Sequence, residues 1–322
     1  MTYRYICAAL LGLNGLVGSA APPLPVAAKV LEDRVRVEVD GALFTEIRTE
    51  GFQSPILWPI QGPGDVRMTR DWPIKEGTPG ESEDHPHHKG LWVGLEKMSG
   101  ANFWHDWSDH SGKVKLAQPV RLSGDAHRAV LEASHRWEAK DGGLVCTEER
   151  TWVFSATAQA RQMDLTMVFS AGEKPLEFVG IKDGFLGMRT HPDLRLTANK
   201  KKGVSEVFGK AVNSEGVQGR AVWRKRADWV HYSGPVEGKS VGIAVINHPE
   251  NPSTDPKGKA WWHARDYGLI AVNPFAPEKI GGDGTTIVAP GKSLTLRYRL
   301  VFHGPDVDVK QVVEWAREFS RP

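Results

Sequence analysis

The densest group of side chains able to do chemistry lies between residues 84 and 90. Asp84, His85, His87 and His88 fall within five positions, and Lys89 follows them. In an extended segment, His85 and His87 project to one face and His88 to the other. Imidazoles change protonation near neutral pH and also ligate metals, so this run is typical of general acid–base catalysis or of a metal site.

Two other interpretations of the same run stay open. The histidine spacing matches no zinc signature, and no glutamate follows at the distance that a cupin-type site needs, so a divalent metal is possible without being indicated. Alternatively, Pro86 makes a turn and the imidazoles bond backbone carbonyls around it. We favour a functional role, because so much titratable material on a loop is costly to bury without a use.

Aromatic and basic residues accompany the histidines in two further clusters. Arg70 precedes the run, and Trp92, Trp104 and His105 follow it. Much later come Trp261, Trp262, His263 and Arg265. Alternation along a strand puts Trp261, His263 and Arg265 on one face. A ring beside arginine and histidine suits an oxygen-rich ligand, because the ring packs on the apolar face of a sugar while the charged groups bond hydroxyls or a carboxylate. The alternative is an edge strand whose tryptophans cover the core.

A third cluster offers a carboxylate. Glu215 lies between Ser214 and Gly216, where a turn could hold it as a general base or leave it solvated. Asp183 and Arg189 add another acid and another base. Because no nucleophile elbow, phosphate loop or dinucleotide fingerprint occurs, the sequence excludes serine hydrolases, kinases and dehydrogenases.

The elements that must position these residues are predicted to be strands. Apolar residues alternate at 35–39, 163–169 and 294–298, and the runs 241–246 and 269–272 are continuously apolar, as strands buried on both faces would be. Residues 129–133 and 151–154 flank an Asp-Gly turn and predict a hairpin. One helix is expected at the C-terminus, capped by Asp308, with these residues on its apolar face: Val309, Val312, Ala316 and Phe319.

These elements predict an all-β fold, a large antiparallel β-sandwich with a C-terminal helix. No helical pattern separates the strands, which argues against a parallel α/β sheet. We expect one domain over residues 21–322, with an architecture like the large sandwich of the sugar mutarotases as an analogy at the level of fold.

Length, charge and the N-terminus narrow the class of protein further. The 322 residues include 41 basic and 39 acidic side chains, a near-neutral balance that gives nucleic acid no footprint. Residues 1–20 read as a signal peptide, with Arg4 before an apolar core and Gly18-Ser19-Ala20 at its end, so we expect a periplasmic or secreted protein. No later apolar run could span a bilayer. With Cys7 removed, Cys146 has no partner, and we expect it to be buried.

The clusters together resemble a bacterial family commonly labelled "methane oxygenase PmoA". The resemblance covers about residues 50 to 300 and is carried by these stretches: Thr69-Arg70-Asp71, Asp84-His85-Pro86-His87-His88, Phe103-Trp104, Asn213-Ser214-Glu215-Gly216, Lys225-Arg226, Val241-Gly242-Ile243-Ala244, His248-Pro249, Asn251-Pro252, Trp262-His263-Ala264-Arg265 and Asn273-Pro274-Phe275.

The resemblance implies a secreted protein of bacteria that degrade complex polysaccharides, and through this it implies carbohydrate chemistry. One stretch departs from the family. Where its members carry His-Gly-Asp-x-Asn-Gly-x-Asp after the tryptophan that corresponds to Trp92, this chain has Leu95-Glu96-Lys97-Met98-Ser99-Gly100-Ala101-Asn102. If the missing histidine and acids take part in the family's chemistry, activity is altered here, or Glu96 and His105 substitute for them.

Three hypotheses follow. The first is an enzyme that uses histidine and acid general acid–base chemistry on a sugar. Its catalytic candidates are His87, His88, His263 and Glu215, and its substrate-binding candidates are Arg70, Asp84, His85, Lys89, Trp92, Trp104, His105, Arg189, Trp262 and Arg265. The second is a non-catalytic carbohydrate-binding protein whose platform consists of Trp92, Trp104, Trp107, Trp261 and Trp262. The third is a metal-dependent oxygenase, as the family label implies.

Overall fold

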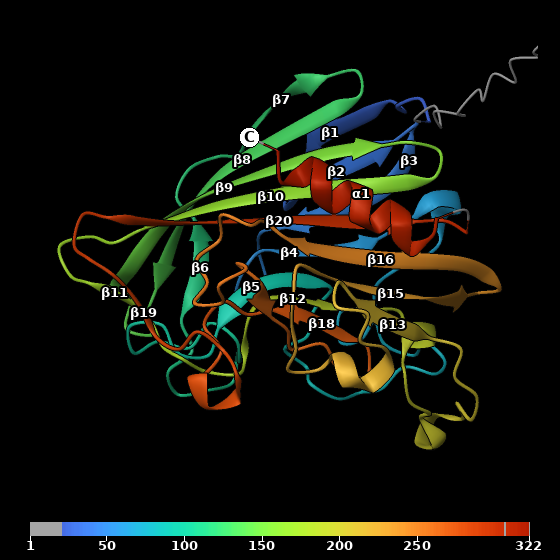
Figure 1. Cartoon of the computed structure of the whole chain (residues 1–322). Coiled ribbons are helices and arrows are strands. Elements are labelled where there is room, and N and C mark those ends of the chain that lie inside the picture. The colour runs from blue at the N-terminus through green and yellow to red at the C-terminus, as the bar shows by residue number, and fades with distance from the viewer. Residues whose placement is uncertain (1–20, 306, 322) are drawn as a thin grey trace, which may run out of the picture.

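The computed structural model describes residues 21–305 and 307–321, and Figure 1 shows two large layered sheets in it. The predicted signal peptide, residues 1–20, lies outside the described residues. No described helix is long and apolar enough to cross a membrane. The predicted antiparallel β-sandwich is confirmed, because the strands of both large sheets pair antiparallel throughout.

The first sheet has seven strands and carries the candidate site. Its strand order is β1-β2-β3-β4-β5-β12-β18, so β5, β12 and β18 lie side by side although they are far apart in the sequence. The strands are β1 (Val26–Val30), β2 (Arg34–Val39), β3 (Ala42–Arg48), β4 (Ile56–Ile60), β5 (Leu91–Leu95), β12 (Gly184–Arg189) and β18 (Leu269–Val272).

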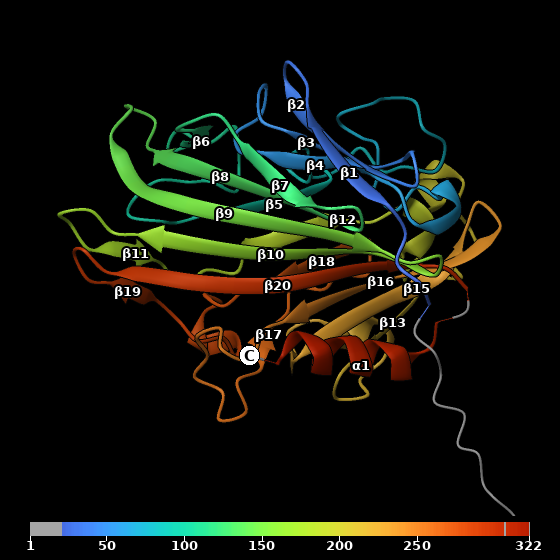
Figure 2. The same cartoon turned by 90° about the horizontal axis from the view of Figure 1, so that it is seen from above.

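The second sheet has nine strands and forms the long curved layer of Figure 2. Its order is β13-β15-β16-β20-β10-β9-β8-β6, with β7 paired to β8. Its strands are β6 (Lys113–Leu116), β7 (Arg121–Asp125), β8 (Arg128–Glu138), β9 (Leu144–Ala156), β10 (Ala160–Ser170), β13 (Lys210–Asn213), β15 (Trp229–Val236), β16 (Lys239–Asn247) and β20 (Ser293–His303).

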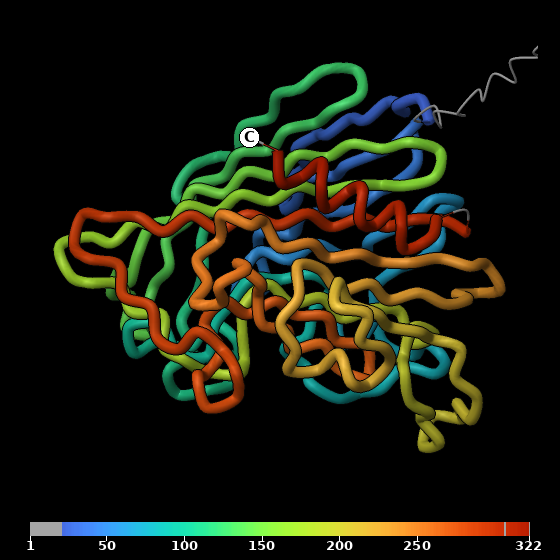
Figure 3. The backbone as a smooth tube through the Cα atoms, in the orientation of Figure 1, coloured from blue at the N-terminus to red at the C-terminus, as the bar shows by residue number. Residues whose placement is uncertain are grey.

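Short elements complete the described chain. Two small antiparallel pairs join β11 to β19 and β14 to β17. In the chain trace of Figure 3, many of the loops that connect the strands gather in the lower half of the view. The remaining elements are β11 (Leu176–Phe178), β14 (Arg226–Ala227), β17 (Ala260–Trp261), β19 (Thr286–Val288) and the 3-10 turns Pro63–Asp65, Pro192–Leu194, Lys200–Lys202, Gly219–Val222 and Glu278–Ile280.

The hydrophobic core fills the space between the two large sheets, as the alternation predicts. The rows at 35–39, 163–169 and 294–300 are buried at every second residue and belong to one cluster. Cys146 lies in this cluster and is 1% exposed, as expected, and its burial raises the pKa of the thiol. The predicted hairpin is also confirmed, because β8 and β9 pair antiparallel with a bulge near Trp137 and Glu138.

The two continuously apolar runs are buried on both faces for different reasons. In β16, one face contacts the core, while Ala244 and Ile246 on the other pack under helix α1 (Val309–Phe319). In β18, Leu269 and Ala271 face a layer of loops that covers the outer surface of the seven-stranded sheet. The candidate site is built in that layer.

The C-terminal helix begins where the sequence predicts. The carboxylate of Asp308 accepts hydrogen bonds from the backbone N–H groups of Lys310 and Gln311. The predicted apolar face needs one correction, because Val309 is 39% exposed. Val309 occupies the first turn and is not part of the cluster under the helix, where the contact with the sheet is made by Val312, Trp315, Ala316 and Phe319.

An ion pair is buried in the core between the sheets. Glu148 accepts hydrogen bonds from Arg150 at 2.7 and 2.8 Å and from the indole of Trp137 at 2.7 Å. Burial opposes the ionisation of Glu148, but Arg150 and His135 outweigh it and hold its pKa below the ordinary value. The pair is satisfied as a unit, so removing one charge leaves the other buried without compensation.

We therefore expect Glu148→Gln to lower the free energy of unfolding by about 3 kcal/mol, because Arg150 stays buried and charged. Urea denaturation with an unchanged m-value measures this loss. The matched control is Glu314→Gln on helix α1, where the partner Arg317 is 62% exposed and the loss should stay below about 0.5 kcal/mol. Equal losses in the two variants would contradict the assignment.

Candidate functional site

The candidate site lies on the outer face of β5, β12 and β18. Alternation along β5 sends Leu91 and Val93 into the core and Trp92 to the outer face, where it packs with Trp104. Gly187 of β12 lies opposite Trp92 in the strand register. A Cβ atom at Gly187 would lie 2.7 Å from Trp92 and 2.9 Å from Trp104, so only glycine leaves room for both indoles. These indoles form the floor beneath the histidines.

The histidine clusters of the sequence converge on one pocket above this floor. Its volume is about 370 Å³. Six predicted site residues line it: His85, His87, His88, His105, His263 and Arg265. Pro86, Trp107, Lys182, Asp183 and Tyr267 complete the wall. The volume is at the small end of ligand pockets, which limits an enclosed ligand to about one sugar ring.

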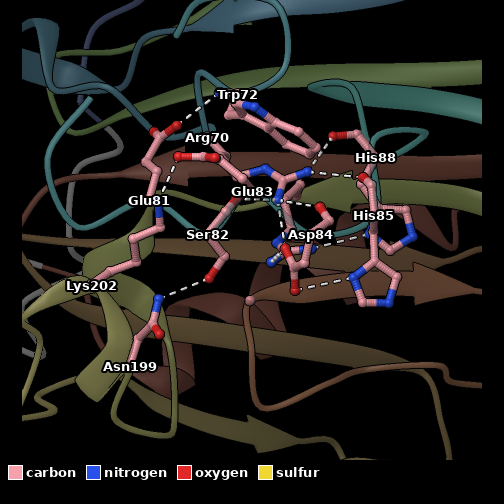
Figure 4. A network of polar contacts seen from close by, with 12 residues as sticks. Arg70, Trp72, Glu81, Ser82, Glu83, Asp84, His85, His88, Asn199 and Lys202 are labelled. Carbon is pink, nitrogen blue, oxygen red and sulfur yellow. Dashed lines mark hydrogen bonds and ion pairs between the residues drawn. The ribbon is translucent and has the colours of Figure 1, made fainter. Parts of the chain in front are cut away.

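Arg70 holds the loop that carries three of these histidines. Its guanidinium is 2% exposed and donates to the backbone carbonyls of Ser82, Asp84, His85 and His88 at 2.9–3.1 Å. Figure 4 shows it surrounded by the loop. Burial, with the nearby Arg189, lowers the pKa of Arg70 to about 9, so it stays charged at neutral pH. Its Nη1 and Nη2 groups are engaged by the loop, which makes Arg70 a positioning residue.

Asp84 connects the loop to the sheet. Its Oδ1 accepts from Arg70 at 2.8 Å, and its Oδ2 lies 3.1 Å from Nδ1 of His85 (Figure 4). The same Oδ1 also accepts from Arg189 of β12 at 2.7 Å. Burial alone would raise the pKa of Asp84, but the contact with His85 and the charges of Arg189 and Arg70 outweigh it and hold the pKa below its usual value. Asp84 is therefore an anion at neutral pH.

His85 is oriented by this carboxylate. Its backbone has φ +51°, a left-handed conformation that costs energy outside glycine and is concentrated at functional sites. Its ring stacks on His88 at 4.8 Å and on Tyr267 at 5.0 Å. Nδ1 faces Asp84 at ion-pair distance, without full hydrogen-bond alignment. A carboxylate favours the proton on Nδ1, which leaves the lone pair of Nε2 free.

Three other imidazoles have the opposite arrangement. Nδ1 of His88 faces the guanidinium of Arg189 at 3.2 Å, and Nδ1 of His263 accepts from the indole of Trp223 at 3.4 Å. Nδ1 of His105 lies 3.4 Å from the amide nitrogen of Asn102, whose oxygen accepts from backbone N–H groups. A donor at Nδ1 fixes the neutral tautomer with its proton on Nε2. Each ring therefore has an N–H donor to offer on its other edge.

His87 lies between the pocket and a smaller cavity. Its ring packs against His88 at 4.2 Å and His105 at 4.6 Å. Its Nδ1 and the Nε1 atoms of Trp92 and Trp104 are enclosed without a hydrogen-bond partner in the described chain. These three residues line the smaller cavity, whose volume is about 10 Å³. That is the space of one water molecule, with two indole donors to bind it.

Four imidazoles of the pocket, those of His87, His88, His105 and His263, have lowered pKa values and are neutral at physiological pH. Burial, followed by the neighbouring His105 and His85, lowers the pKa of His87 to about 2. Burial, followed by the charges of Lys182 and Arg265, lowers that of His263 to about 3. The pKa values of His88 and His105 are lowered as well, mainly by burial. The pocket therefore combines neutral imidazole donors with the fixed cations Lys182 and Arg265.

Several predicted residues support the pocket without lining it. Arg189 and Trp92 lie beneath the histidines, and Lys89 is paired with Asp106 beside the small cavity. Trp262 is fully buried in the core, where its indole donates to Ala227. Residues 261–265 alternate as predicted, and His263 and Arg265 line the pocket. Trp262 lies on the opposite face, which points to the core, so the prediction that it binds substrate is wrong.

Glu215 is not brought to the pocket. It lies on the turn after β13, where it pairs with Lys259 and contacts Ser214. The bond with Lys259 is the main cause that lowers its pKa. It is partly exposed and is not among the residues that line the pocket, so the structure gives this carboxylate no contact with the histidines.

Three residues of the site were not among the candidates from the sequence. Lys182 precedes β12 beside Asp183, the acid that the sequence did point out, Tyr267 lies in the turn after Arg265, and Trp223 packs on Arg265. Their signal was weak, because single polar residues beside strands are common. Asp183 lies near Glu96, and burial followed by this acidic neighbour raises the pKa of Glu96. Glu96 thus lies close to the pocket wall, in the stretch that departs from the resembled family.

A metal at this pocket does not fit the donor set. A ligating Nε2 must offer its lone pair, and its Nδ1–H then donates to an acceptor. In His88, His105 and His263 the Nδ1 atoms face donors instead, so their Nε2 atoms carry protons. Within residues 21–305 and 307–321, no group of three His, Cys, Asp or Glu side chains is arranged to hold a metal ion. We derive no step through a metal.

Fold and site together define a class: an antiparallel β-sandwich protein with a histidine-rich ligand pocket on the outer face of one sheet. Within this class, the chain belongs to the family DUF6807, described as a family of unknown function, whose sequence model matches residues 34–317. No curated protein matches the sequence. The resemblance to the family labelled "methane oxygenase PmoA" stays a prediction.

Solved structures with a distant likeness include Slr1438 protein from Synechocystis sp. PCC 6803 (11% identity, 92% of this chain and 100% of that chain, TM-score 0.38). Another is galactose 1-epimerase from Lactobacillus acidophilus NCFM (9% identity, 89% of this chain and 100% of that chain, TM-score 0.39). The chain spans 40% of the GH36 α-galactosidase AgaA from Geobacillus stearothermophilus (12% identity, 87% of this chain, TM-score 0.39). At these TM-scores the likenesses carry no argument about function.

We expect Asp84→Asn to loosen the histidine loop, because Arg70 and Arg189 lose the anion between them. The free energy of unfolding should fall by about 2 kcal/mol, less than for a fully enclosed pair since Asp84 is partly exposed. The neighbouring variant Glu83→Gln is the control, because its partner is the exposed Lys202. Denaturant titration compares the two, and a loss no larger than that of Glu83→Gln would refute the anchoring role.

The imidazole protonation states are directly measurable by nitrogen-15 NMR of labelled histidines. Between pH 8 and 5, His88 and His263 should not titrate and should show the tautomer with the proton on Nε2. This difference determines how stability depends on pH. Below about pH 6.5, these histidines bind protons in the unfolded chain but stay unprotonated in the folded chain, so the free energy of unfolding falls as the pH falls. Titration of either ring near pH 6.5 would contradict its burial.

Proposed function

We propose that the pocket binds a sugar unit and carries out general acid–base chemistry on it. The observation that carries this proposal is the sorting of the imidazoles by their Nδ1 partners. His85, which faces a carboxylate, has a free Nε2 lone pair and serves as the base. His88, whose Nδ1 faces Arg189, and His263, whose Nδ1 accepts from Trp223, have Nε2–H groups that serve as donors. Acid–base catalysis needs both kinds of group at one ligand.

The wall of the pocket supports a sugar as the ligand. Hydroxyl groups both donate and accept, and they meet imidazole donors, the cations Lys182 and Arg265 and the carboxylate of Asp183. The ring of Trp107, which is 58% exposed, offers an apolar face to the C–H side of a sugar ring. Burial raises the pKa of Tyr267 to about 12, so its hydroxyl keeps its proton and can donate.

The chemistry of a proton-transfer enzyme can then be assigned to this chain's residues. Nε2 of His85 accepts a proton from a substrate O–H or C–H group, and Asp84 stabilises the imidazolium that forms. The donors that stay fixed, His88 and His263, stabilise negative charge developing on a substrate oxygen. Asp183 at the same wall is the second acid–base group. Such a set suits an epimerase, a lyase or a hydrolase.

The burial of most of its tryptophans counts against the competing hypothesis of a binding platform. Of its five tryptophans, Trp107 is 58% exposed, while Trp92, Trp104, Trp261 and Trp262 are at most 4% exposed. A flat exposed stacking surface is therefore not formed by these residues. The metal-dependent oxygenase is disfavoured by the donor arrangement around the imidazoles. We further propose that the protein acts in the periplasm or outside the cell, as its N-terminal sequence predicts.

The test begins with a substrate screen. The full chain is incubated with a library of monosaccharides, oligosaccharides and oxidised sugars, and products are followed by mass spectrometry and proton NMR. Turnover of any sugar that the library contains supports the proposal. Binding without a product would favour the non-catalytic alternative, and neither binding nor turnover would overturn the proposed function.

With a turned-over sugar in hand, we expect His85→Gln to reduce kcat by a factor of about 100 or more, because the base is lost. Binding of the same sugar should change little, since the donors of the pocket remain. The control is His110→Gln, whose side chain is exposed and does not line the pocket. An unchanged kcat in His85→Gln, with a folded protein, would exclude His85 as the base.

A further inference from the structure

The half-buried guanidinium of Arg265 differs from those of the other enclosed arginines in the described chain, because it has neither a carboxylate nor another hydrogen-bond acceptor as a partner. Its guanidinium packs on the ring of Trp223 at 4.4 Å and on that of Tyr267 at 5.0 Å. Asp266, the acid next to it in the sequence, is paired with Arg220, and Asp183, the acid that lines the same pocket, is paired with Lys182. Within residues 21–305 and 307–321, the guanidinium of Arg265 makes no hydrogen bond or ion pair.

Other half-buried and buried arginines have partners within the described chain. Arg195 is buried without a carboxylate, but its guanidinium donates to the hydroxyl of Ser82 and the backbone carbonyl of Thr197. The structure pairs a carboxylate with each of the following: Arg67, Arg70, Arg150, Arg161, Arg189, Arg226 and Arg299. Placing a guanidinium in a partly enclosed site without an anion is costly unless a ligand supplies one. Arg265 lines the pocket, so its unengaged N–H groups can meet a ligand there.

The surroundings of Arg265 also favour an anion. Lys182 lies on the same pocket wall, and Arg224 packs on the ring of Trp223 at 4.2 Å. The charged groups lining the pocket are two cations, Lys182 and Arg265, against the one anion Asp183. His263, beside them, adds a neutral N–H donor. A pocket with this balance attracts negative charge and holds it by hydrogen bonds.

We propose that the sugar bound by this pocket is acidic, a uronic acid type of sugar whose carboxylate pairs with Arg265. This inference rests on the proposed function and specifies its substrate class. A guanidinium presents parallel N–H groups that match the two oxygens of a carboxylate, which favours this anion over a hydroxymethyl group. Tyr267 contacts both Arg265 and His85, so the carboxylate lies near the proposed base.

The experiment compares D-glucuronate with D-glucose, which differ by a carboxylate in place of a hydroxymethyl group. Binding of each to the full chain is measured by isothermal titration calorimetry or ligand-observed NMR, with galactose 6-sulfate as a sulfate-bearing sugar. We expect glucuronate to bind at least tenfold more tightly than glucose. Arg265→Gln should abolish this preference, so that the affinities for glucuronate and glucose differ by no more than about twofold.

The matched control is Arg224→Gln, which removes the other guanidinium on Trp223 from an exposed position outside the pocket lining. It should keep the preference for glucuronate. Thermal unfolding confirms that both variants fold, and Arg265→Lys, which keeps the charge without the paired N–H groups, should restore only part of the preference.

The outcomes separate the two proposals. Glucose bound as tightly as glucuronate, a stronger binding of the sulfated sugar, or an undiminished preference in Arg265→Gln would overturn the acidic-sugar inference and leave a sugar site in place. Failure of all three sugars to bind would overturn this inference, and failure across the whole substrate library would overturn the proposed function with it.

Discussion

The site depends on the contacts that the carboxylate of Asp84 makes with its two arginine neighbours and one histidine. One of its oxygens compensates two guanidiniums, those of Arg70 and Arg189, that are at most 2% exposed, and the other orients His85. Each of these cations would be costly to bury alone, and together they would also repel each other. Because the carboxylate binds both guanidiniums, it offsets their repulsion and joins the histidine loop to strand β12. We call this contact the junction at Asp84. The left-handed backbone of His85 is held by the same junction.

The floor and wall of the pocket then determine what the imidazoles can do. Glycine at position 187 lets Trp92 and Trp104 approach the strand, and the rings above them are shielded from water. Shielding keeps His87 and His263 neutral even though other titratable rings crowd them. Neutral rings with fixed tautomers are preorganised dipoles, and preorganised dipoles need no rearrangement when charge develops on a ligand. Burial is therefore part of the chemistry of the site.

Much of the fold followed from the sequence because its signals are local. Period-two alternation identified the buried rows, such as residues 163–169, and the cap at Asp308 located the helix. Residue types gave the hypothesis that the histidine, tryptophan and arginine clusters form one site, but only the structure brings His85, His263 and Arg265 to one pocket. The direction of each side chain was not predictable, because it depends on neighbours distant in sequence. The side chain of Arg70 points into the loop, and Glu215 forms an ion pair with Lys259 and does not contact the histidines.

The junction at Asp84 also constrains the order in which the chain can acquire its pocket. Arg70 is 14 residues from Asp84, whereas Arg189 is 105 residues away. During synthesis from the N-terminus, the loop can therefore contact its first guanidinium long before the second one exists. A nascent or truncated chain that ends before β12 has the imidazole-bearing segment without the strand that anchors it. The ligand site matures only after more than half of the polypeptide has been made.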